Sequence, residues 1–203
     1  MTKTVLIATN NAHKVAEISD ALAFTGWRFV SLKEAGIVSD PEETGTTFAE
    51  NARIKALAAH QVSGMATLAD DSGLEVDALG GAPGIFSARY AGEHGHDGDN
   101  NDLVLKNLGD LPFRDRGARF VCALAFVDEG GKELSALGKV EGRIGFAPQG
   151  EAGFGYDPLF FPAEYDYTCT FAQVPMDEKA KISHRGRALR DLARQIQEKE
   201  ATR

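Results

Sequence analysis

The sequence predicts a mixed α/β fold, and two observations carry this prediction. A short apolar segment at residues 4–8 is followed by a loop and then by apolar residues at helical spacing, Val15, Ile18 and Leu22. This is the pattern of a strand–loop–helix unit. Two strand-like segments, residues 119–127 and a second one from Glu133, are separated only by the turn residues 128–131. They indicate a hairpin, so the sheet is mixed rather than purely doubly wound.

Composition and charge restrict the classes of function. The chain has 203 residues, is 43% apolar and 26% charged, and carries a net charge of −8. No run approaches the roughly 18 apolar residues of a membrane-spanning helix, and the first residues lack the apolar core of a signal peptide. The acidic balance argues against binding to nucleic acid or to an anionic membrane. A small polyanion is not excluded, because it needs only a few local cations.

The two cysteines indicate a compartment. Cys122 and Cys169 lie far apart and have no spacing typical of metal ligands. This pattern favours reduced thiols over a disulfide framework, and therefore the cytoplasm.

The loop between the first strand and the first helix is a candidate anion site. It reads Thr9-Asn10-Asn11-Ala12-His13-Lys14, and the helix is expected at residues 15–24. Backbone N–H groups and the helix dipole favour an anion at such a turn, and Lys14 adds a positive charge. The loop lacks the glycines of a Walker motif, so a plain capped helix start is the simpler alternative.

An acidic loop precedes the second long helix. After a strand predicted at residues 27–32, Thr47 and Glu50 match a capping box that opens a helix to about Val62. The capping box explains Glu50 but not Glu43, which is either a solvated charge or a metal ligand. Lys55, two turns into the helix, is equally ambiguous, since most helix lysines face water.

Two adjacent carboxylates form the centre of the sequence. An apolar run at residues 65–69 reads as a buried strand and ends in Asp70-Asp71-Ser72-Gly73. Such a sequence makes a good turn between two strands. The alternative is a ligand site at the carboxyl end of a strand, where the aspartates would hold a divalent cation through oxygen ligands.

The middle of the chain offers weaker signals. The polar segment at residues 92–99 is expected to be a loop, and its two histidines have no regular ligand spacing, which disfavours a metal role. Asp99 or Asn100 is predicted to cap a short helix that ends at Leu108.

The last third contains two candidate binding segments. Residues 150–158 form a loop rich in glycine and aromatic residues, in which Phe154 and Tyr156 either pack in the core or stack on a flat ring. Ser183 could cap the final helix. His184 and Arg185 then stand at its N-terminus, against the preference of the helix dipole. A residue type that its local secondary structure disfavours is weak evidence for a functional role.

Taken together, these motifs carry a resemblance. They follow one another from residue 9 to residue 186: Thr9-x-Asn11-x-x-Lys14, Glu42-Glu43-Thr44-Gly45-x-Thr47-Phe48-x-Glu50-Asn51-Ala52, Ala69-Asp70-Asp71-Ser72-Gly73-Leu74, Gly80-Gly81-Ala82-Pro83-Gly84, Ser87-Ala88-Arg89-Tyr90, Gly153-Phe154-Gly155-Tyr156-Asp157-Pro158 and Ser183-His184-Arg185-Gly186. In this set and order, the sequence resembles the inosine/xanthosine triphosphate pyrophosphatase family, the Ham1/RdgB-like proteins.

The resemblance implies a fold and an activity. The fold would be one domain, residues 1–203, with an elongated, two-lobed mixed α/β structure around a central curved sheet flanked by helices, and with a cleft between the lobes. The activity would be Mg²⁺-dependent hydrolysis of non-standard purine nucleoside triphosphates (ITP, dITP and XTP) to the monophosphate and pyrophosphate, with Mn²⁺ as a substitute metal. A cytoplasmic homodimer is expected, with a purine nucleotide as its partner and neither nucleic acid nor membrane.

The resemblance also implies roles for residues. Glu43 and Asp71 would hold Mg²⁺, and Asp71 would be the general base. Ser72 would contact the substrate. The remaining substrate-binding residues that it implies are Thr9, Asn10, Asn11, Ala12, His13 and Lys14 at the phosphates, Lys55 and Lys179 as added charge, and Phe154, Gly155, Tyr156, Asp157, His184 and Arg185 at the base.

Two other functions compete with this expectation. A Maf-like pyrophosphatase that acts on other modified bases would share the general architecture, but segments 154–157 and 183–185 argue against it. A non-catalytic nucleotide-binding regulator is disfavoured because binding alone needs no carboxylate to position water.

Overall fold

The computed structural model of the chain describes residues 3–9, 11–22, 26–92 and 96–201. Within them the protein forms one six-stranded sheet with the strand order β2-β1-β3-β4-β5-β6. The strands are β1 Thr4–Ile7, β2 Arg28–Ser31, β3 Ala66–Val76, β4 Gly117–Val127, β5 Glu133–Ile144 and β6 Phe160–Pro162.

Strand directions in the sheet are mixed, as the sequence predicts. β1 runs parallel to both of its neighbours, so that Leu6 pairs with Val30 of β2 and with Thr67 of β3. β5 and β6 are antiparallel, with Arg143 opposite Phe161. β4 and β5 are neighbours joined by the short turn after Val127, which confirms the predicted hairpin.

By contact, the chain divides into two compact units. Unit 1 contains residues 1–71, 122–138 and 185–203, and unit 2 contains residues 72–121 and 139–184. The strands β3, β4 and β5 each continue from one unit into the other.

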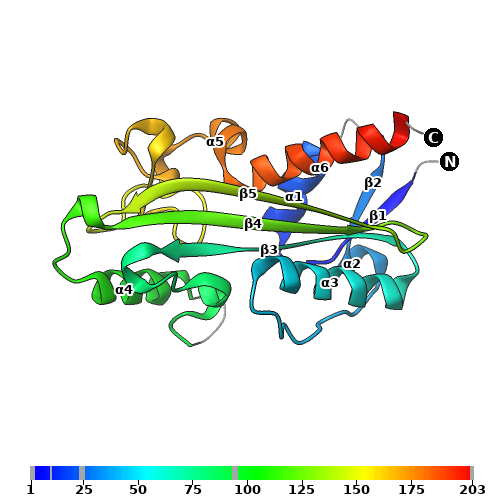
Figure 1. The fold of residues 1–203 in the computed structure, drawn as a ribbon, viewed down its shortest axis with the longest axis horizontal. Helices are drawn as coiled ribbons and strands as arrows, with labels where there is room; N and C mark the ends of the chain where they lie inside the picture. Colours follow the sequence, from blue (N-terminus) through cyan, green and yellow to red (C-terminus); the bar gives the residue numbers. More distant parts are fainter. Residues whose placement is uncertain (1–2, 10, 23–25, 93–95, 202–203) are drawn as a thin grey trace. The chain divides into compact units, whose positions relative to one another are not determined.

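Unit 1 has helices on both sides of its part of the sheet (Figure 1). Helices α1 (Ala12–Ala21) and α6 (His184–Ala201) lie together on one side, and α3 (Phe48–Ser63) lies on the other, with the short α2 (Leu32–Ala35) beside it. Apolar residues of α1, α6 and the strands form one core, including Ile18, Leu68, Leu124 and Leu192. This core fixes the first turns of α1 and α6, which carry several candidate site residues.

Unit 2 has its own core. Helix α4 (Asp97–Leu108) packs its Val104 and Leu108 with residues of the strands and with Phe160 and Phe171. The second helix of this unit, α5 (Met176–Ile182), was not predicted from the sequence. Its seven residues follow Pro175 and carry Lys179 on a buried face.

Three local predictions differ from the structure. β3 is one strand of eleven residues. Asp70-Asp71-Ser72-Gly73 is therefore neither a turn nor the end of a strand. Cross-strand pairing overrides the turn preference of these residues, because β3 is also a neighbour of the eleven-residue strand β4, whereas β1 pairs only with Ala66, Thr67 and Leu68. α1 begins at Ala12 and α4 at Asp97, each earlier than predicted.

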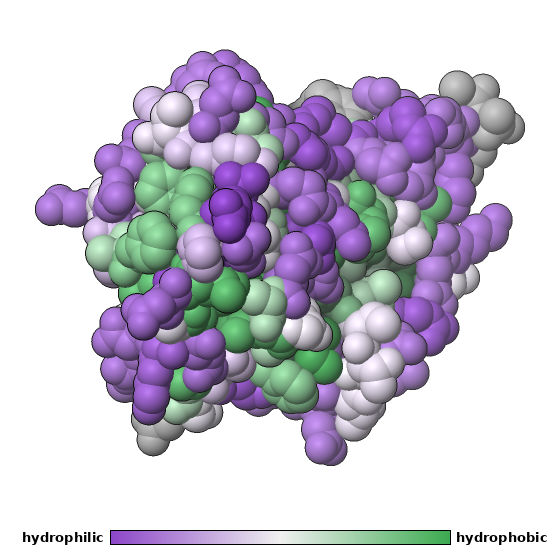
Figure 2. Space-filling model, turned by 60° about the vertical axis from the view of Figure 1, so that its left-hand side comes forward, coloured by the Kyte–Doolittle hydropathy of each residue, from purple (hydrophilic) through white to green (hydrophobic). Residues whose placement is uncertain are grey.

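The predicted start and end of the second long helix are confirmed. Thr47 and Glu50 form a capping box at the start of α3, and Gly64 ends that helix with a positive φ. Both cysteines are free thiols. No helix in the described part of the chain is long and apolar enough to cross a membrane. The surface in Figure 2 is mostly hydrophilic, with hydrophobic residues exposed in patches between polar ones.

Candidate functional site

Unit 1 brings Glu43, Lys55 and Asp71 together, and we call these three residues the carboxylate cluster. The Lys55 ammonium lies 2.8 Å from Asp71 Oδ1 and 3.0 Å from Glu43 Oε1. Lys55 comes from the middle of α3, Glu43 from the loop before that helix and Asp71 from β3. The structure thus joins the two predicted metal ligands through one predicted phosphate-binding cation.

A second group of charges in unit 1 consists of the buried Asp70 and Arg185 and of the half-buried Lys14 and Glu17. Asp70 Oδ2 lies 3.0 Å from the Lys14 ammonium and 3.3 Å from the Arg185 guanidinium. Arg185 also pairs with Glu17 of α1 at 2.6 Å. The side chains of Asp70 and Arg185 are 0% and 3% exposed. The buried charges of Asp70 and Arg185 are therefore balanced by each other and by the half-buried Lys14 and Glu17, as buried charges require.

The two adjacent aspartates differ in proton affinity. Burial raises the pKa of Asp71, and nearby Glu43 adds to this effect, while Lys55 opposes it without reversing it. Burial alone would raise the pKa of Asp70 too, but Lys14 and Arg185 outweigh it and hold that pKa well below its ordinary value. Asp71 is accordingly the stronger base, and Asp70 stays a carboxylate that holds cations.

The predicted phosphate loop is only partly described. Asn11 Oδ1 accepts the backbone N–H of Lys14, and Thr9 Oγ1 accepts that of Asn11. These bonds cap α1 and place Lys14 in its first turn. Asn10 lies outside the described residues, as do the side chains of Ala12 and His13. The anion-binding role of this segment stays a prediction.

The carboxylate cluster fits a divalent cation. Asp71 Oδ2 is buried and has no hydrogen-bond partner among the described residues. A buried carboxylate oxygen in this state is suited to a bound cation or to a further hydrogen-bond donor. No group of three or more potential side-chain ligands occurs in the described ranges. Two carboxylates nevertheless suit Mg²⁺, which keeps several waters and takes further oxygens from substrate phosphates.

In unit 2, the segment of residues 153–157, which we call the aromatic loop, is fixed by a buried ion pair. The Asp157 carboxylate contacts the Lys179 ammonium of α5 and accepts the backbone N–H of Phe154 at 3.0 Å. The same ammonium lies 5.3 Å from the centre of the Phe154 ring. The prediction that Lys179 adds charge at the phosphates stays a prediction, because its partner in the structure is Asp157.

Helix α4 holds the aromatic loop from another side. Asp97 Oδ2 accepts the backbone N–H of Gly155 at 2.6 Å, and Asn101 Nδ2 donates to the carbonyl of the same glycine at 3.0 Å. Gly155 has a φ of 63°, a conformation that glycine adopts without strain. The buried Tyr156 hydroxyl donates to the carbonyl of Ser87. Gly155 is thus positioned through its backbone groups, and Tyr156 through its side-chain hydroxyl.

The remaining predicted residues of unit 2 are His184 and Ser72. His184 is buried and stacks on Phe120, with the ring centroids 4.9 Å apart and an interplanar angle of 16°. Ser72 is half-buried. The predicted contacts of both residues with the substrate are not tested.

Sequence reasoning missed several residues that build these arrangements. Glu17, Asp97 and Asn101 stand in none of the motifs, and Ser87 stands in the motif of residues 87–90 but was given no role. A signal did exist for two of them, since Asp97 and Asn101 are four apart and therefore lie on one helix face. It could not be used while residue 97 was assigned to a loop.

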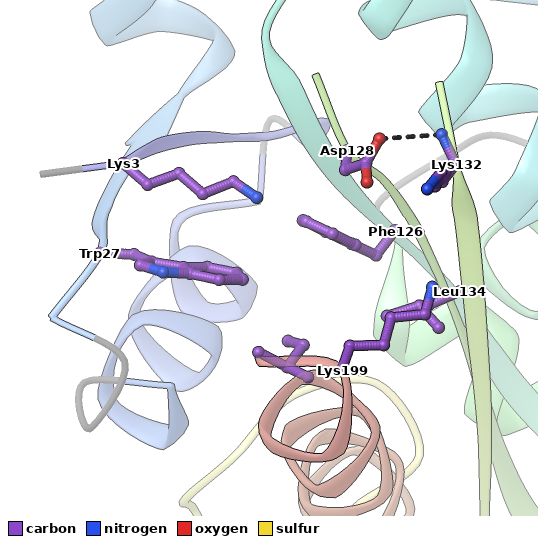
Figure 3. A pocket seen from close by; sticks show the side chains of 8 residues that line it. Lys3, Trp27, Phe126, Asp128, Lys132, Leu134 and Lys199 are labelled. Atoms are coloured by element: carbon purple, nitrogen blue, oxygen red, sulfur yellow. Dashed lines mark hydrogen bonds between the residues drawn. The ribbon is translucent and has the colours of Figure 1, made fainter. Parts of the chain in front are cut away.

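One small pocket of unit 1 is separate from these arrangements (Figure 3). It has a volume of about 40 Å³ and contains none of the predicted site residues. The Lys3 ammonium lies 4.5 Å from the Trp27 ring and 5.1 Å from the Phe126 ring, and these two rings stack on each other. The aromatic faces already have partners in the protein, so the pocket is a surface crevice and not a rival site.

Comparisons with known proteins decide the family. A model of the Ham1 family matches residues 5–195. The chain belongs to the Ham1 family. A relative from Clostridium perfringens, named dITP/XTP pyrophosphatase, is 50% identical over 196 residues, which cover 94% of this chain and 95% of the relative. One from Vibrio cholerae with the same name is 47% identical and covers 97% and 98% of the two chains.

Solved Ham1 structures show the same fold. A HAM1 protein from Coxiella burnetii matches with a TM-score of 0.88 and 40% identity, over 97% of this chain and 100% of that one. A protein from Mycobacterium abscessus, titled nucleoside-triphosphatase / dITP/XTP pyrophosphatase, matches with a TM-score of 0.77 and 44% identity, over 93% and 98% of the chains. The fold class and the family expected from the sequence are therefore confirmed.

Proposed function

We propose that this protein hydrolyses dITP, ITP and XTP to the monophosphate and pyrophosphate, and thereby removes non-standard purines from the nucleotide pool. The observation that carries the proposal is the meeting of Glu43 and Asp71 at one ammonium, in a chain of the Ham1 family whose relatives are named for this activity. The family match does not favour the alternatives of a Maf-like enzyme or a binding regulator.

The proposed metal is Mg²⁺, with Mn²⁺ as a substitute, held by Glu43 and Asp71. Bound there, it would polarise phosphate oxygens and lower the pKa of an attacking water. Lys55 now neutralises both carboxylates at about 3 Å. When a cation takes over that task, the Lys55 ammonium becomes available to the polyphosphate.

In this proposal, Asp71 is the general base that accepts a proton from the attacking water. Burial raises the pKa of Asp71, whereas Lys14 and Arg185 keep Asp70 ionised and engaged. Lys14 can turn from Asp70 to a phosphate without leaving that aspartate alone, because Arg185 remains as its partner. A positioned base contributes roughly 10²- to 10⁴-fold to the rate.

The aromatic loop of unit 2 would bind the purine. A loop whose glycine is held by backbone hydrogen bonds presents a fixed surface for a flat ring, and the Phe154 ring is oriented by Lys179. Hypoxanthine and xanthine carry a 6-keto acceptor where adenine carries an amino donor, so a donor such as His184 would reject adenine. A site built around such a bond can discriminate by about 10⁴.

Arg185 was also predicted to read the base, and this role stays a prediction. In the structure, its guanidinium pairs with Glu17 and Asp70 in unit 1. We further propose that the two units are lobes of one catalytic domain of a cytoplasmic homodimer. The free thiols accord with a reducing compartment.

A turnover assay tests the function. The protein is incubated with dITP, XTP, GTP or ATP in Mg²⁺, in Mn²⁺ or with EDTA, and pyrophosphate and orthophosphate are detected separately. We expect pyrophosphate from dITP and XTP, little product from ATP and GTP, and no turnover with EDTA. Release of orthophosphate would move the cleaved bond to the terminal phosphate, and the absence of any product would favour a binding regulator.

A further inference from the structure

Asn51 is a fully buried polar residue near the start of α3 to which no role has been given. It is 0% exposed, and its Oδ1 accepts the backbone N–H of Gly45 at 2.9 Å. The contact between loop and helix is close. A Cβ on Gly45 would lie 2.6 Å from Asn51 Oδ1 and 2.7 Å from Glu50 Cβ. Only glycine fits at position 45 without displacing the loop from α3.

Helix α3 therefore anchors the loop that carries Glu43. The N–H groups of Thr46 and Thr47 donate to the Glu50 carboxylate at 2.7 and 3.1 Å, next to the bond from Gly45 to Asn51. Three consecutive N–H groups of the loop are thus bound by two side chains of one helix. Glu43 lies two residues before this anchored stretch, so its position relative to α3 depends on the anchor.

The other end of the Asn51 amide, Nδ2, is not bound by any residue that the structure describes. Because Oδ1 faces an N–H donor, the orientation of the amide follows from its chemistry, and Nδ2 is the free end. Nδ2 is buried and has no hydrogen-bond partner among the described residues. A buried donor in this state costs about 1–3 kcal/mol. An acceptor from outside the chain would recover that cost.

The position of Asn51 on α3 indicates where the acceptor lies. Asn51 and Lys55 are four residues apart and share one face of the helix. Helical side chains lean toward the N-terminus, so the Lys55 side chain extends back over the turn of Asn51. The Lys55 ammonium contacts Glu43 and Asp71. Nδ2 therefore belongs to the face of α3 that carries the carboxylate cluster.

We propose that Asn51 is a positioning residue of the metal site. Its Oδ1 fixes the loop of Glu43, and its Nδ2 donates to an oxygen on the bound cation, either a water or a phosphate oxygen. The proposal rests on the proposed function, because it takes Glu43 and Asp71 as the ligands of the cation. Partners that orient metal ligands typically change affinity or activity by about 10- to 100-fold when removed.

The first test uses Asn51→Leu, which keeps the shape of the side chain and removes both polar atoms. Binding of Mn²⁺ alone, and of pyrophosphate in the presence of Mg²⁺, is measured by calorimetry together with the melting temperature. A loss of about 10- to 100-fold for Mn²⁺ alone would support a positioning role of Asn51 through the anchor, the donor or both, since the variant removes both polar atoms. A loss only with pyrophosphate would identify a phosphate oxygen. Unchanged affinities in both titrations would overturn the proposal, even if the melting temperature falls.

A second variant covers the case in which Asn51→Leu does not fold. Asn51→Asp keeps an acceptor for the Gly45 N–H but loses the Nδ2 donor. It should retain the anchor of the Glu43 loop and bind pyrophosphate at least about tenfold more weakly. Gln61→Glu adds the same charge at an exposed position of α3 and should bind normally. Equal affinities of Asn51→Asp and Gln61→Glu would refute the role of Nδ2.

The anchor is tested separately with Gly45→Ala, which forces the loop away from α3 and leaves the amide in place. We expect weaker Mn²⁺ binding because Glu43 moves with the loop, and normal Mn²⁺ binding would refute the anchoring role. Wild-type controls separate the two proposals. If the wild type binds neither Mn²⁺ nor pyrophosphate, the proposed function fails. If it binds both and the variants match it, only the role of Asn51 fails.

Discussion

The two units hold their candidate residues by different means. In unit 1, Lys14, Lys55 and Arg185 are held by side-chain ion pairs with carboxylates. In unit 2, the aromatic loop contains one buried ion pair, between Asp157 and Lys179, and is held in addition at three backbone groups, the N–H and the carbonyl of Gly155 and the N–H of Phe154. Ion pairs between side chains can exchange partners when a charged ligand arrives. Backbone hydrogen bonds keep a fixed shape.

This difference matches two kinds of recognition. A polyphosphate and its metal carry charges of both signs. These can replace the partners in the ion pairs of unit 1, so lysine and arginine side chains that are paired with carboxylates suit such a ligand. A purine base is flat and uncharged, and its selection depends on the geometry of one or two hydrogen bonds. Changes in unit 1 should therefore affect mainly turnover and stability, and changes around the aromatic loop should affect mainly selectivity.

The largest effect is expected from Asp71→Asn. The amide cannot accept the proton of water and is a poor metal ligand, so kcat should fall by at least about 10²- to 10⁴-fold. Pyrophosphate release from dITP in saturating Mg²⁺ measures this effect. Asp191→Asn makes the same change on α6, where Asp191 pairs with Arg194, and should retain activity. Turnover of Asp71→Asn within a factor of ten of the wild type would contradict the assignment of the base.

A large effect on stability is expected from Asp70→Asn. The change leaves Lys14 and Arg185 without their shared carboxylate in a buried site, which typically costs about 3–5 kcal/mol of unfolding free energy. Urea unfolding of the metal-free protein at pH 7 measures it. Arg53→Ala is the matched control, because it breaks an ion pair with Glu133 whose side chains are 59% and 39% exposed. Exposed pairs contribute at most about 1 kcal/mol.

The same variant should change the pH dependence of stability. The pKa of Asp70 is lower in the folded than in the unfolded protein, so its contribution is fully present above the unfolded value near 3.8. It is lost as the pH falls through the lower folded value. Between about pH 5 and pH 3, the wild type should therefore lose stability more steeply than Asp70→Asn. Parallel curves for the two proteins would show that Asp70 is not held ionised by its partners.

A smaller effect, on selectivity, is expected from Asp97→Ala. It removes the charged acceptor of the Gly155 N–H, a bond of about 1.5–3 kcal/mol. The ratio of kcat/KM for dITP over dATP should fall by about tenfold or more, mainly through KM, while kcat for dITP changes little. Asp99→Ala alters the same first turn of α4, at a residue that is exposed and pairs with His96, and is the control. A fall in kcat with unchanged selectivity would contradict the assignment of turnover to unit 1 and of base selectivity to the aromatic loop of unit 2.

Local signals in the sequence predicted much of the fold. The capping box of Thr47 and Glu50, the first strand and the hairpin after Val127 all follow from nearest neighbours in the chain. The strand through Asp70 and Asp71 was missed, because its partners are distant in sequence and turn chemistry is the stronger local signal. Helix α5 was missed because seven residues carry too little periodicity.

The sequence alone determined which chemical groups are present and, through the order of its motifs, the family. Only the tertiary structure decided which groups meet. That Asp71 shares Lys55 with Glu43, while its neighbour Asp70 is bound by Lys14 and Arg185, cannot be inferred from adjacent positions in the chain. The physical reason is that side chains of successive strand residues point to opposite faces. The two aspartates therefore meet different partners, and their proton affinities move apart.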